Sequence, residues 1–497
     1  MTGIQEKYLP VIGLEIHSQL NTNTKAFCGC SAKHNSPPNT NVCPVCLGSP
    51  GALPVLNKKA VYLALKAGIA LNCRINYKSV FARKNYFYPD LPKGYQITQY
   101  ETPLCYDGSL EIPVQNNLKK RIGIERIHIE EDAGKSIHEI SETETLLDFN
   151  RCGIPLIEIV TKPEINSPEE AEVLARKIRR ILTFLNICDG NMEEGSLRFD
   201  ANISLKHKDK KEQYGKTEIK NLNSFKYLKD ALNLEIQRQK YLIESENKIK
   251  HNTINYDANN KKIAVLRTKE EEEDYRYFPE PDLIPLKVTK ELIAEIKNSI
   301  QELPEDKKER FIIQYQISES KADILTRNKM ICEYFEHTIN LLKIKNTEQF
   351  KNTANWILRE VIKELNESKS KSIDDFPVKP KQLSSLLDIL YTGKINIKTA
   401  KEVFQIMIQS KDEREKDPEY IIKSHNFYQI QDESEIEDII IGILKVYTEE
   451  TNKYRSGEHK IEGFLIGKIM KLTEGRANPE TVNKILKKIV FEVQSRI

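Results

Sequence analysis

The chain has 497 residues, 30% of them charged and 39% hydrophobic, and its formal net charge is only +3. Bulk charge therefore gives no argument for nucleic-acid binding, and any basic surface must be local. The chain has no run of 18 or more apolar residues, so no membrane span is predicted, and the polar residues 1–10 lack the apolar core of a signal peptide. We therefore expect a cytoplasmic protein, and its length predicts two to four domains.

The first predicted element is a β-strand over residues 11–20, where apolar and polar side chains alternate. Its polar face carries Glu15, His17 and Gln19, and a carboxylate and an imidazole two residues apart can share a metal ion. An exposed sheet face explains the same pattern and, for this segment alone, is the more ordinary interpretation.

Four of the nine cysteines follow in one cluster, as Cys28-x-Cys30, twelve further residues and Cys43-x-x-Cys46. Two close pairs separated by a loop predict a closed, structural Cys₄ zinc site, inserted over residues 28–46. Free thiols or a disulfide are the alternatives, and nothing nearby resembles the thioredoxin-type helix of a redox site. The other five cysteines lie among apolar residues, and we expect them to be buried.

Residues 81–96 combine aromatic rings, cations and two prolines, unlike an ordinary core strand. Stiff prolines beside exposed aromatic and cationic side chains predict a surface that holds an anionic, partly planar ligand. Residues 273–282 form a second run of aromatic, charged and proline residues, and their composition predicts a rigid loop.

Four later segments repeat the alternation seen in residues 11–20. They cover residues 125–131, 156–160, 196–205 and 217–221, and their polar faces carry Arg126, His128, Glu130, Glu158, Arg198, Asp200, Asn202, Ser204, Glu218 and Lys220. A carboxylate within an apolar run, as at Glu158, is costly to bury unless it is paired or bound to a cation. Together the strands predict a concave, charged cleft, in which carboxylates and histidine bind Mg²⁺ while Arg and Lys hold phosphate oxygens.

Helix signals increase toward the C-terminus. Ser167, Pro168 and Glu170 predict the start of a helix with Ser167 as its N-cap. From about residue 288 the chain is charged and amphipathic with few glycines, which predicts helices, and residues 410–418 predict a linker. We therefore predict an α+β fold with a mixed-sheet domain over residues 1–290, an all-α domain over residues 291–410 and an all-α tail over residues 411–497.

The tail is locally basic. Between Lys453 and Lys488 nine Lys and Arg residues stand against four Asp and Glu residues. Such a tail can contact RNA phosphates without recognising their sequence, although a solvated helix face explains the charge equally well. An apolar stripe over residues 461–472 predicts the core of a small helical bundle.

Several catalytic motifs are missing from the sequence. It has no Gly-rich P-loop, no Gly/Ser-rich amidase signature with a lysine and no evident Cys–His glutaminase motif. ATP binding would therefore not use a P-loop, and a chain of this kind that uses ammonia needs a partner to supply it.

Nine segments, in order and over nearly the whole chain, resemble one known family. They cover residues 11–17, 43–57, 83–96, 150–163, 191–202, 218–225, 274–285, 356–360 and 463–479. The sequence of these segments resembles the B subunit of the aspartyl/glutamyl-tRNA(Asn/Gln) amidotransferases. Some relatives lack part of the cysteine set, whereas this chain has all four residues, which favours zinc.

The resemblance implies a function for each part of the chain. The N-terminal cradle would bind ATP and Mg²⁺, phosphorylate the side-chain carboxylate of Glu or Asp on misacylated tRNA(Gln) or tRNA(Asn), and pass the acyl group to ammonia. The glutaminase (amidase) A subunit would deliver the ammonia through a tunnel, the small C subunit would brace the pair, and the helical and tail domains would recognise the tRNA.

The resemblance also implies roles for single residues. It places Glu15, His17, Glu130 and Glu158 around Mg²⁺, Arg198, Asp200, Glu218 and Lys220 in the nucleotide and acyl pocket, and Lys84 and Lys93 on the path of ammonia or substrate. Two rival hypotheses explain less. A carboxylate–amine ligase for a free small molecule leaves the long helical tail unexplained, and a non-catalytic zinc-bearing RNA-binding scaffold leaves the aligned carboxylates unexplained.

Overall fold

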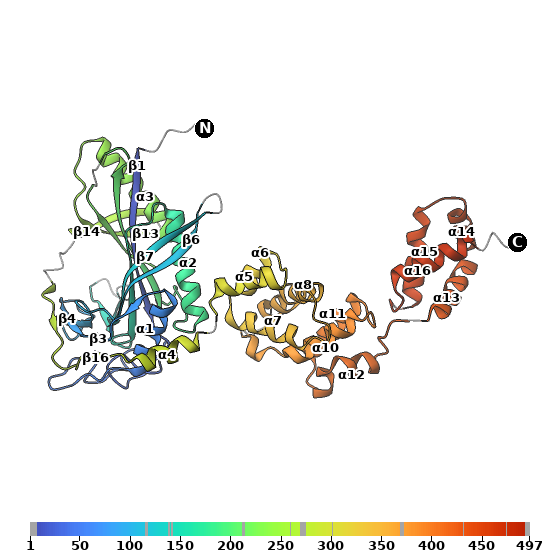
Figure 1. The fold of residues 1–497 in the computed structure, drawn as a ribbon, viewed down its shortest axis with the longest axis horizontal. Coiled ribbons are helices and arrows are strands. Elements are labelled where there is room, and N and C mark those ends of the chain that lie inside the picture. The colour runs from blue at the N-terminus through green and yellow to red at the C-terminus, as the bar shows by residue number, and fades with distance from the viewer. Residues whose placement is uncertain are drawn as a thin grey trace. The chain divides into compact units, whose positions relative to one another are not determined.

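The chain forms two compact units, residues 1–304 and 305–497 (Figure 1). The computed structural model describes residues 7–114, 118–137, 140, 143–210, 214–258, 260–268, 275–300, 302–367, 372–430, 432–473 and 475–492. Within these residues the strands all lie in the first unit, and the second unit contains helices only, so the predicted α+β class is confirmed. No helix in this described part is both long and apolar enough to cross a membrane.

A nine-stranded sheet dominates the first unit, in the order β14-β13-β12-β11-β1-β10-β7-β6-β2. Its strands are β1 (Tyr8–Gln19), β2 (Arg74–Ile75), β6 (Cys105–Pro113), β7 (Lys119–Glu131), β10 (Pro155–Thr161), β11 (Leu197–His207), β12 (Thr217–Leu222), β13 (Asn252–Asp257) and β14 (Lys262–Thr268). Neighbouring strands are antiparallel except β12 and β13, which are parallel. All five predicted strand segments belong to this sheet, and β1 lies between the other four predicted strands.

The apolar side of the sheet is closed by helices. The predicted alternation is confirmed on β1, where Ile12, Leu14 and Ile16 are fully buried. Helices α2 (Pro168–Phe184) and α3 (Phe225–Glu244) pack against each other and against sheet strands (Figure 1). Helix α2 begins as predicted, because the Ser167 hydroxyl accepts a hydrogen bond from the Glu170 amide at 3.1 Å. This packing leaves the opposite face of the sheet for the polar side chains.

Three small sheets complete the strands of the described residues. The first is β15-β4-β5, formed by β15 (Phe278–Pro279), β4 (Ala82–Asn85) and β5 (Tyr95–Thr98). The second is β16-β3, formed by β16 (Leu286–Lys287) and β3 (Lys78–Ser79), and the third is β8-β9, formed by β8 (Lys135–Ile137) and β9 (Leu146–Asp148). The first of them joins the two runs that the sequence singled out separately. Arg83 donates two hydrogen bonds to the carboxylate of Glu280, at 2.7 and 2.8 Å, and its guanidinium lies 4.2 Å from the Tyr95 ring centroid. Residues 273 and 274 of the second run lie outside the described residues.

Two further helices pack together in the first unit, and the remaining helices form the second. Helices α1 (Lys58–Ala70) and α4 (Lys290–Ser299) are in contact. The second unit contains α5 (Pro304–Gln314), α6 (Glu319–Leu325), α7 (Lys329–Leu341), α8 (Thr347–Trp356), η3 (Ile357–Val361), α9 (Ile362–Glu367), η4 (Ile373–Asp375), α10 (Pro380–Tyr391), α11 (Ile397–Gln409), η5 (Glu413–Lys416), α12 (Pro418–Ser424), α13 (Glu433–Val446), α14 (Thr448–Arg455), α15 (Lys460–Leu472), α16 (Pro479–Lys487) and η6 (Lys488–Glu492). The domain boundaries at residues 290 and 410 stay predictions.

Residues 430–490 share one hydrophobic core, to which α13 to α16 all contribute. The predicted stripe on α15 enters this core only in part. Leu465 and Ile469 are fully buried, whereas 42% of Phe464 and 62% of Leu472 are exposed. Phe464 instead packs edge-on against Tyr447, with ring centroids 5.5 Å apart. The helix therefore turns two of its five apolar stripe residues toward its surface.

Candidate active site and metal centres

Neighbouring strands place charged side chains next to one another on the polar face of the large sheet. The strand register pairs His17 of β1 with Glu158 of β10, and Glu158 in turn with His128 of β7. On the other side of β1 the register pairs Glu15 with Asp200 of β11. Because paired residues on one face of a sheet have neighbouring side chains, the register alone brings these groups together.

One cluster consists of His17, Glu130 and Glu158, joined by His128. The Nε2 atom of His17 lies 3.6 Å from Glu158 Oε2 and 3.8 Å from Glu130 Oε1. The Nε2 atom of His128 lies 3.2 Å from Glu158 Oε2 and 3.5 Å from Glu130 Oε2. One ligand atom from each of His17, Glu130 and Glu158 lies within 4.8 Å of the other two. This is a compact set of two carboxylates and one imidazole.

Charge within this first cluster shifts the pKa values of its members. Burial alone would lower the pKa of His128, but the Glu158 carboxylate and Glu130 raise it to about 9. Burial would raise the pKa of Glu158, yet the two histidines hold it well below its ordinary value. At neutral pH the protonated imidazole of His128 therefore offsets part of the negative charge of these carboxylates.

A second cluster lies beside the first and consists of Glu15, Asp200 and Glu218, again with one oxygen of each within 4.8 Å of the others. Asn202 Nδ2 donates to Glu15 Oε1 at 2.7 Å, and Thr253 Oγ1 donates to Glu218 Oε2 at 3.1 Å. Burial, followed by the charges of Glu158, Asp200 and Glu218, raises the pKa of Glu15. The sequence grouped Glu15 with His17, Glu130 and Glu158, whereas the structure places it with this neighbouring set of carboxylates.

Three of the four Lys and Arg side chains that were predicted for the site occupy different positions around the clusters. Lys220 Nζ lies 3.8 Å from Glu218 Oε1. Lys84 Nζ, on β4, lies 4.6 Å from the centroid of the Tyr275 ring, and Glu130 and the neighbouring tyrosines raise its pKa although burial opposes this. Arg198 instead donates to Asp132 Oδ1 at 3.1 Å. Lys84 and Lys220 line the charged cavity, but Arg198 does not.

The fourth predicted cation, Lys93, lies in a separate cavity. Its ammonium forms an ion pair with Glu131, beside Cys46 and Phe27. Glu131 follows Glu130 on β7, and successive strand residues point to opposite sides. The structure therefore does not bring Lys93 into the charged cavity with Lys84.

The charged cavity holds eight of the ten residues predicted for the catalytic site and the substrate path. It has a volume of about 160 Å³ and is lined by Glu15, His17, Lys84, Glu130, Glu158, Asp200, Glu218 and Lys220, together with His128 and Tyr277. The β15-β4-β5 sheet supplies Lys84, and the segment before β15 supplies Tyr275 and Tyr277. Tyr277 stacks on Tyr100 with ring centroids 4.1 Å apart.

Sequence reasoning left several of these groups without a role. His128 was placed on the face of Glu130 but not assigned, although its strand position was a sufficient signal. Asp132 orients Arg198 and accepts a hydrogen bond from Gln19 Nε2 at 2.7 Å. Thr253 had no local signal, because it reaches Glu218 through the parallel pairing of β13 with β12.

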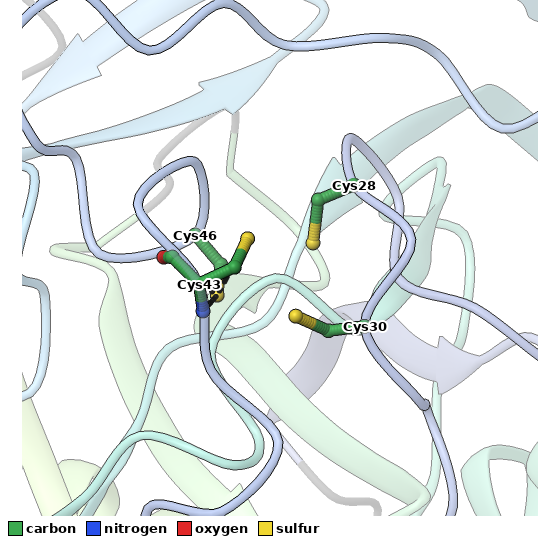
Figure 2. A group of neighbouring side chains, drawn as sticks. All are labelled: Cys28, Cys30, Cys43 and Cys46. Atoms are coloured by element: carbon green, nitrogen blue, oxygen red, sulfur yellow. Dashed lines mark hydrogen bonds between the residues drawn. The ribbon is translucent and has the colours of Figure 1, made fainter.

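The four clustered cysteines come together as predicted (Figure 2). Cys28 and Cys30 lie on one loop segment, Cys43 and Cys46 lie on another, and all four Sγ atoms are within 4.8 Å of one another. Cys43 and Cys46 have Sγ atoms 3.9 Å apart, close to the roughly 3.8 Å expected between two ligands of tetrahedral zinc. The donor set therefore fits a structural zinc ion.

The surroundings of Cys46 favour its thiolate. The Cys43 backbone amide donates to its Sγ atom at 3.2 Å, and the ammonium of the fully buried Lys25 donates at 3.6 Å. A hydrogen bond from Cys28 and the interactions with these two donors lower the pKa of Cys46 to about 4, although burial alone would raise it. The thiolate is the form of cysteine that binds metal.

Comparison with known proteins identifies the family. A family model described as GatB/GatE catalytic domain matches residues 10–294, and a second, described as GatB domain, matches residues 333–490. The aspartyl/glutamyl-tRNA(Asn/Gln) amidotransferase B subunit from Thermodesulfovibrio yellowstonii is 49% identical over 486 residues, covering 98% of this chain and 100% of the relative. The chain belongs to the amidotransferase B-subunit family.

Other members of the B-subunit family give the same result. Proteins of the same name from Persephonella marina and Carboxydothermus hydrogenoformans are 45% and 46% identical over 484 residues, covering 97% of this chain and 100% and 98% of the relatives. The family predicted from the nine segments is therefore confirmed. As a member of this family, the chain is a component of a tRNA-dependent amidotransferase, a ligase.

Proposed function

We propose that this chain activates the side-chain carboxylate of Glu or Asp on misacylated tRNA(Gln) or tRNA(Asn) with ATP and Mg²⁺, and amidates it with ammonia. The observation that supports this most strongly is the pair of adjoining ligand clusters on one sheet face, with Lys84 and Lys220 in the same cavity. Family membership supplies the substrate class, and the cavity supplies groups suited to phosphoryl transfer.

Carboxylate oxygens with one imidazole form a donor set that suits Mg²⁺. The raised pKa of Glu15, crowded by three carboxylates, is the electrostatic condition that a bound cation relieves. Glu15, His17, Glu130 and Glu158 would hold Mg²⁺, with Asp200 and Glu218 completing the set around Glu15. The ion, when bound, neutralises phosphate charge and polarises the transferred phosphoryl group.

The chain's own residues then have defined tasks. A carboxylate is a poor electrophile, and transfer of the ATP γ-phosphoryl group to one of its oxygens creates a leaving group. Ammonia attacks the carbonyl carbon, the C–N bond forms, and the bond from carbon to the phosphate oxygen breaks. Inorganic phosphate leaves and takes up the proton that the nitrogen loses. Lys84 and Lys220 offset the negative charge that develops, while Tyr275 and Tyr277 restrict access of water to the cavity.

The proposal also includes partners. The sequence has no evident glutaminase motif, so a glutaminase (amidase) A subunit would deliver ammonia, with a small C subunit in the same complex. Lys84 and Lys93 would mark the ammonia and substrate path, and the helical and tail domains would bind the tRNA. Because tRNA amidation serves translation, we propose a cytoplasmic location, and we assign Zn²⁺ to Cys28, Cys30, Cys43 and Cys46.

The direct test uses the chain co-expressed with its glutaminase and small partners. With ATP, Mg²⁺, glutamine and tRNA(Gln) carrying labelled Glu, we expect labelled Gln on the tRNA only when ATP is present. Unconverted Glu, with Asp on tRNA(Asn) also unconverted by the assembled complex, would favour the scaffold. Conversion of free glutamate without tRNA would favour the small-molecule ligase.

Substitutions in the two clusters test the assignment of the site. Glu15→Gln and His17→Ala should each lower ATP-dependent amidation by at least about a hundredfold, because each removes a metal ligand. Glu244→Gln, at the exposed end of α3, is the matched control and should retain full activity. Circular dichroism checks that the fold is intact, and full activity of both cluster variants would remove the metal assignment.

A further inference from the structure

The cysteine cluster and the Lys93–Glu131 ion pair share one small cavity. Its lining includes the cysteines Cys28 and Cys46 together with Gly48, Lys93 and Glu131. The cavity has a volume of about 50 Å³, which is room for a few molecules the size of water but not for a substrate. In a space of this size, a small movement of one lining segment changes the surroundings of the ion pair.

The Lys93–Glu131 pair is nearly excluded from solvent. Only 6% of the Lys93 side chain and 2% of the Glu131 side chain are exposed. The Glu131 carboxylate is fixed independently, because its Oε1 atom also accepts a hydrogen bond from the Ile97 amide at 3.0 Å. Lys93 has a long, flexible side chain, and a buried ion pair is favourable only where packing maintains its geometry. The position of Lys93 therefore depends on the residues that pack around it.

Gly48 packs directly on the Lys93 side chain. A Cβ atom added to Gly48 would lie 2.5 Å from Lys93 Cγ and 3.1 Å from Lys93 Cα. The first distance is far shorter than a carbon–carbon contact, so residue 48 can carry a side chain only if Lys93 moves. Gly48 also has a φ of +70°, a conformation that favours glycine. The missing side chain at Gly48 therefore leaves the space that Lys93 occupies.

Gly48 belongs to the same turn as two of the clustered cysteines. We call residues 43–49 the cysteine turn. The Leu47 amide donates a hydrogen bond to Cys43 O at 3.0 Å. The Gly48 amide donates to Val45 O at 3.1 Å. These bonds fix Gly48 relative to the two cysteines of the turn, so a shift of these cysteines also shifts the residue on which Lys93 packs.

A second segment beside Lys93 carries the other two cysteines. Phe27 lies directly before Cys28, and its ring centroid is 5.9 Å from Lys93 Nζ. The two cysteine pairs come from separate stretches of the chain (Figure 2), and their four Sγ atoms lie within 4.8 Å of one another. A metal ion held by all four thiolates would join the two stretches that pack on Lys93.

Side chains outside the cluster hold the cysteine turn through bonds that involve sulfur. Cys152 Sγ donates to Cys46 O at 3.3 Å, and the ammonium of Lys25 donates to Cys46 Sγ at 3.6 Å. Sulfur is a weak donor and a weak acceptor, whereas four bonds to a structural zinc ion contribute directly to folding. Metal binding should therefore decide how firmly the turn is held against Lys93.

We propose that the four-cysteine site positions Lys93. A metal ion bound there holds Phe27 and Gly48 against the Lys93 side chain and keeps its ammonium on Glu131. Loss of the metal ion releases the cysteine turn, and Lys93 becomes accessible to solvent. The consequence for amidation rests on the proposed function, which puts Lys93 on the path of ammonia or substrate, whereas the positioning itself does not depend on it.

The first test measures the accessibility of Lys93 in the assembled complex. Brief treatment with acetic anhydride acetylates exposed amines, and mass spectrometry of peptides gives the rate at each lysine. Removal of zinc with EDTA should raise the rate at Lys93 by at least about tenfold, because local opening then becomes easier, and added zinc should restore protection. Lys66 of α1, whose ammonium donates to Leu185 O at 3.0 Å, is the internal control and should keep its rate.

A pair of glycine variants tests the contact without removing a thiol. Gly48→Ala should raise the acetylation rate of Lys93 by a similar factor, although the complex keeps its zinc. Gly51→Ala is the matched control, because Gly51 also has a positive φ, of +80°, but an added Cβ would meet nothing within 4 Å. It carries the same backbone strain without the contact, so Lys93 should stay protected.

Three results would overturn the proposal. They are an unchanged rate at Lys93 after zinc removal, equal rates in the two glycine variants, and a rise at Lys66 that matches the rise at Lys93, since general unfolding would explain the last. Amidation is measured separately and should fall in Gly48→Ala but not in Gly51→Ala. If the wild-type complex does not amidate tRNA at all, the proposed function fails, and the acetylation rates still decide whether the cysteine site positions Lys93.

Discussion

Asp132 is a buried acidic residue whose partners fix the position of Arg198. It accepts hydrogen bonds from Arg198 and from Gln19, and Arg151 Nε lies 3.8 Å away. Burial alone would raise the pKa of Asp132, but the two guanidinium groups, Arg198 first, lower it to about 2. The position of the Arg198 guanidinium at the edge of the clusters therefore depends on a charge outside them.

We predict that Asp132→Asn lowers the free energy of unfolding of the first unit by about 2 kcal/mol at pH 7. This follows from a pKa of about 2, against 3.8 in the unfolded chain, at 1.36 kcal/mol per unit. Because the pKa is depressed, this stability is present above about pH 4 and is lost as pH falls toward 2. Urea unfolding of both proteins at pH 7 and pH 3 measures the difference, which should be smaller at pH 3. An equal difference at both pH values would contradict the role of the Asp132 charge.

We predict that Cys46→Ser lowers the zinc content of the purified chain from one ion per chain to well below half. The Cys46 thiolate forms most readily among the cluster thiols whose pKa is shifted, since the pKa of Cys30 is raised to about 11. Elemental analysis measures the zinc. Cys73→Ser, outside the cluster, is the matched control and should keep its zinc, and an unchanged content in Cys46→Ser would remove the zinc assignment.

Secondary-structure elements meet closely where α1 crosses β6. Gly68 of α1 faces Cys105 of β6, and a Cβ atom added to Gly68 would lie 2.3 Å from Cys105 Sγ. Cys105 is fully buried, so its side chain has little room to move. The glycine is required here by space, and not by an unusual backbone conformation.

We predict that Gly68→Ala destabilises the first unit, although alanine favours helices. Helix propensity would gain about 1 kcal/mol, but overpacking a core contact costs roughly 1–3 kcal/mol, and the cost should prevail. Thermal unfolding measures the net effect. Adding Cys105→Ala should restore part of the loss. A Gly68→Ala variant more stable than wild type would show that the contact is easily relieved.

The strands and their faces were predictable, but the pairing of distant elements was not. Alternation over residues 11–20 and 196–205 determined which side chains are buried, because a strand has two faces and one of them is apolar. The position of Lys84 above the clusters depends on β4 pairing with β5 and β15, and no local pattern encodes that pairing. Lys93 was grouped with Lys84 by resemblance, and only the structure separates their two cavities.

At the scale of the whole molecule, the proposed chemistry belongs to the first unit and the proposed tRNA recognition to the second. Each has its own hydrophobic residues, and residues 430–490 form a core of their own. Several basic side chains of this part are exposed, and some are paired locally, as Lys487 is with Glu462 at 3.0 Å. Local pairing reduces the charge available for phosphate, so the contribution of the tail must be measured.

We predict that removing residues 411–497 weakens tRNA binding by at least about tenfold and leaves ATP binding unchanged. Basic side chains of the tail contribute through phosphate contacts, so the lost affinity should also carry most of the salt dependence. Filter binding of tRNA at roughly 50 and 200 mM salt, beside calorimetry with the β,γ-imido analogue of ATP, measures both. Unchanged tRNA affinity in the truncated chain would contradict the assignment of the tail.

The pairing of Arg83 with Glu280 affects how the first unit is made. The two residues are separated by 197 positions, and the strand pair β15–β4 that contains this region closes the small sheet of the charged cavity. At about 5–20 residues per second, a ribosome needs roughly 10–40 s to travel from one partner to the other. During that interval the strands that carry the carboxylates are made, but Tyr275 and Tyr277, which line the same cavity, are not yet present. The wall of the charged cavity can therefore be completed only after most of the first unit has been synthesised.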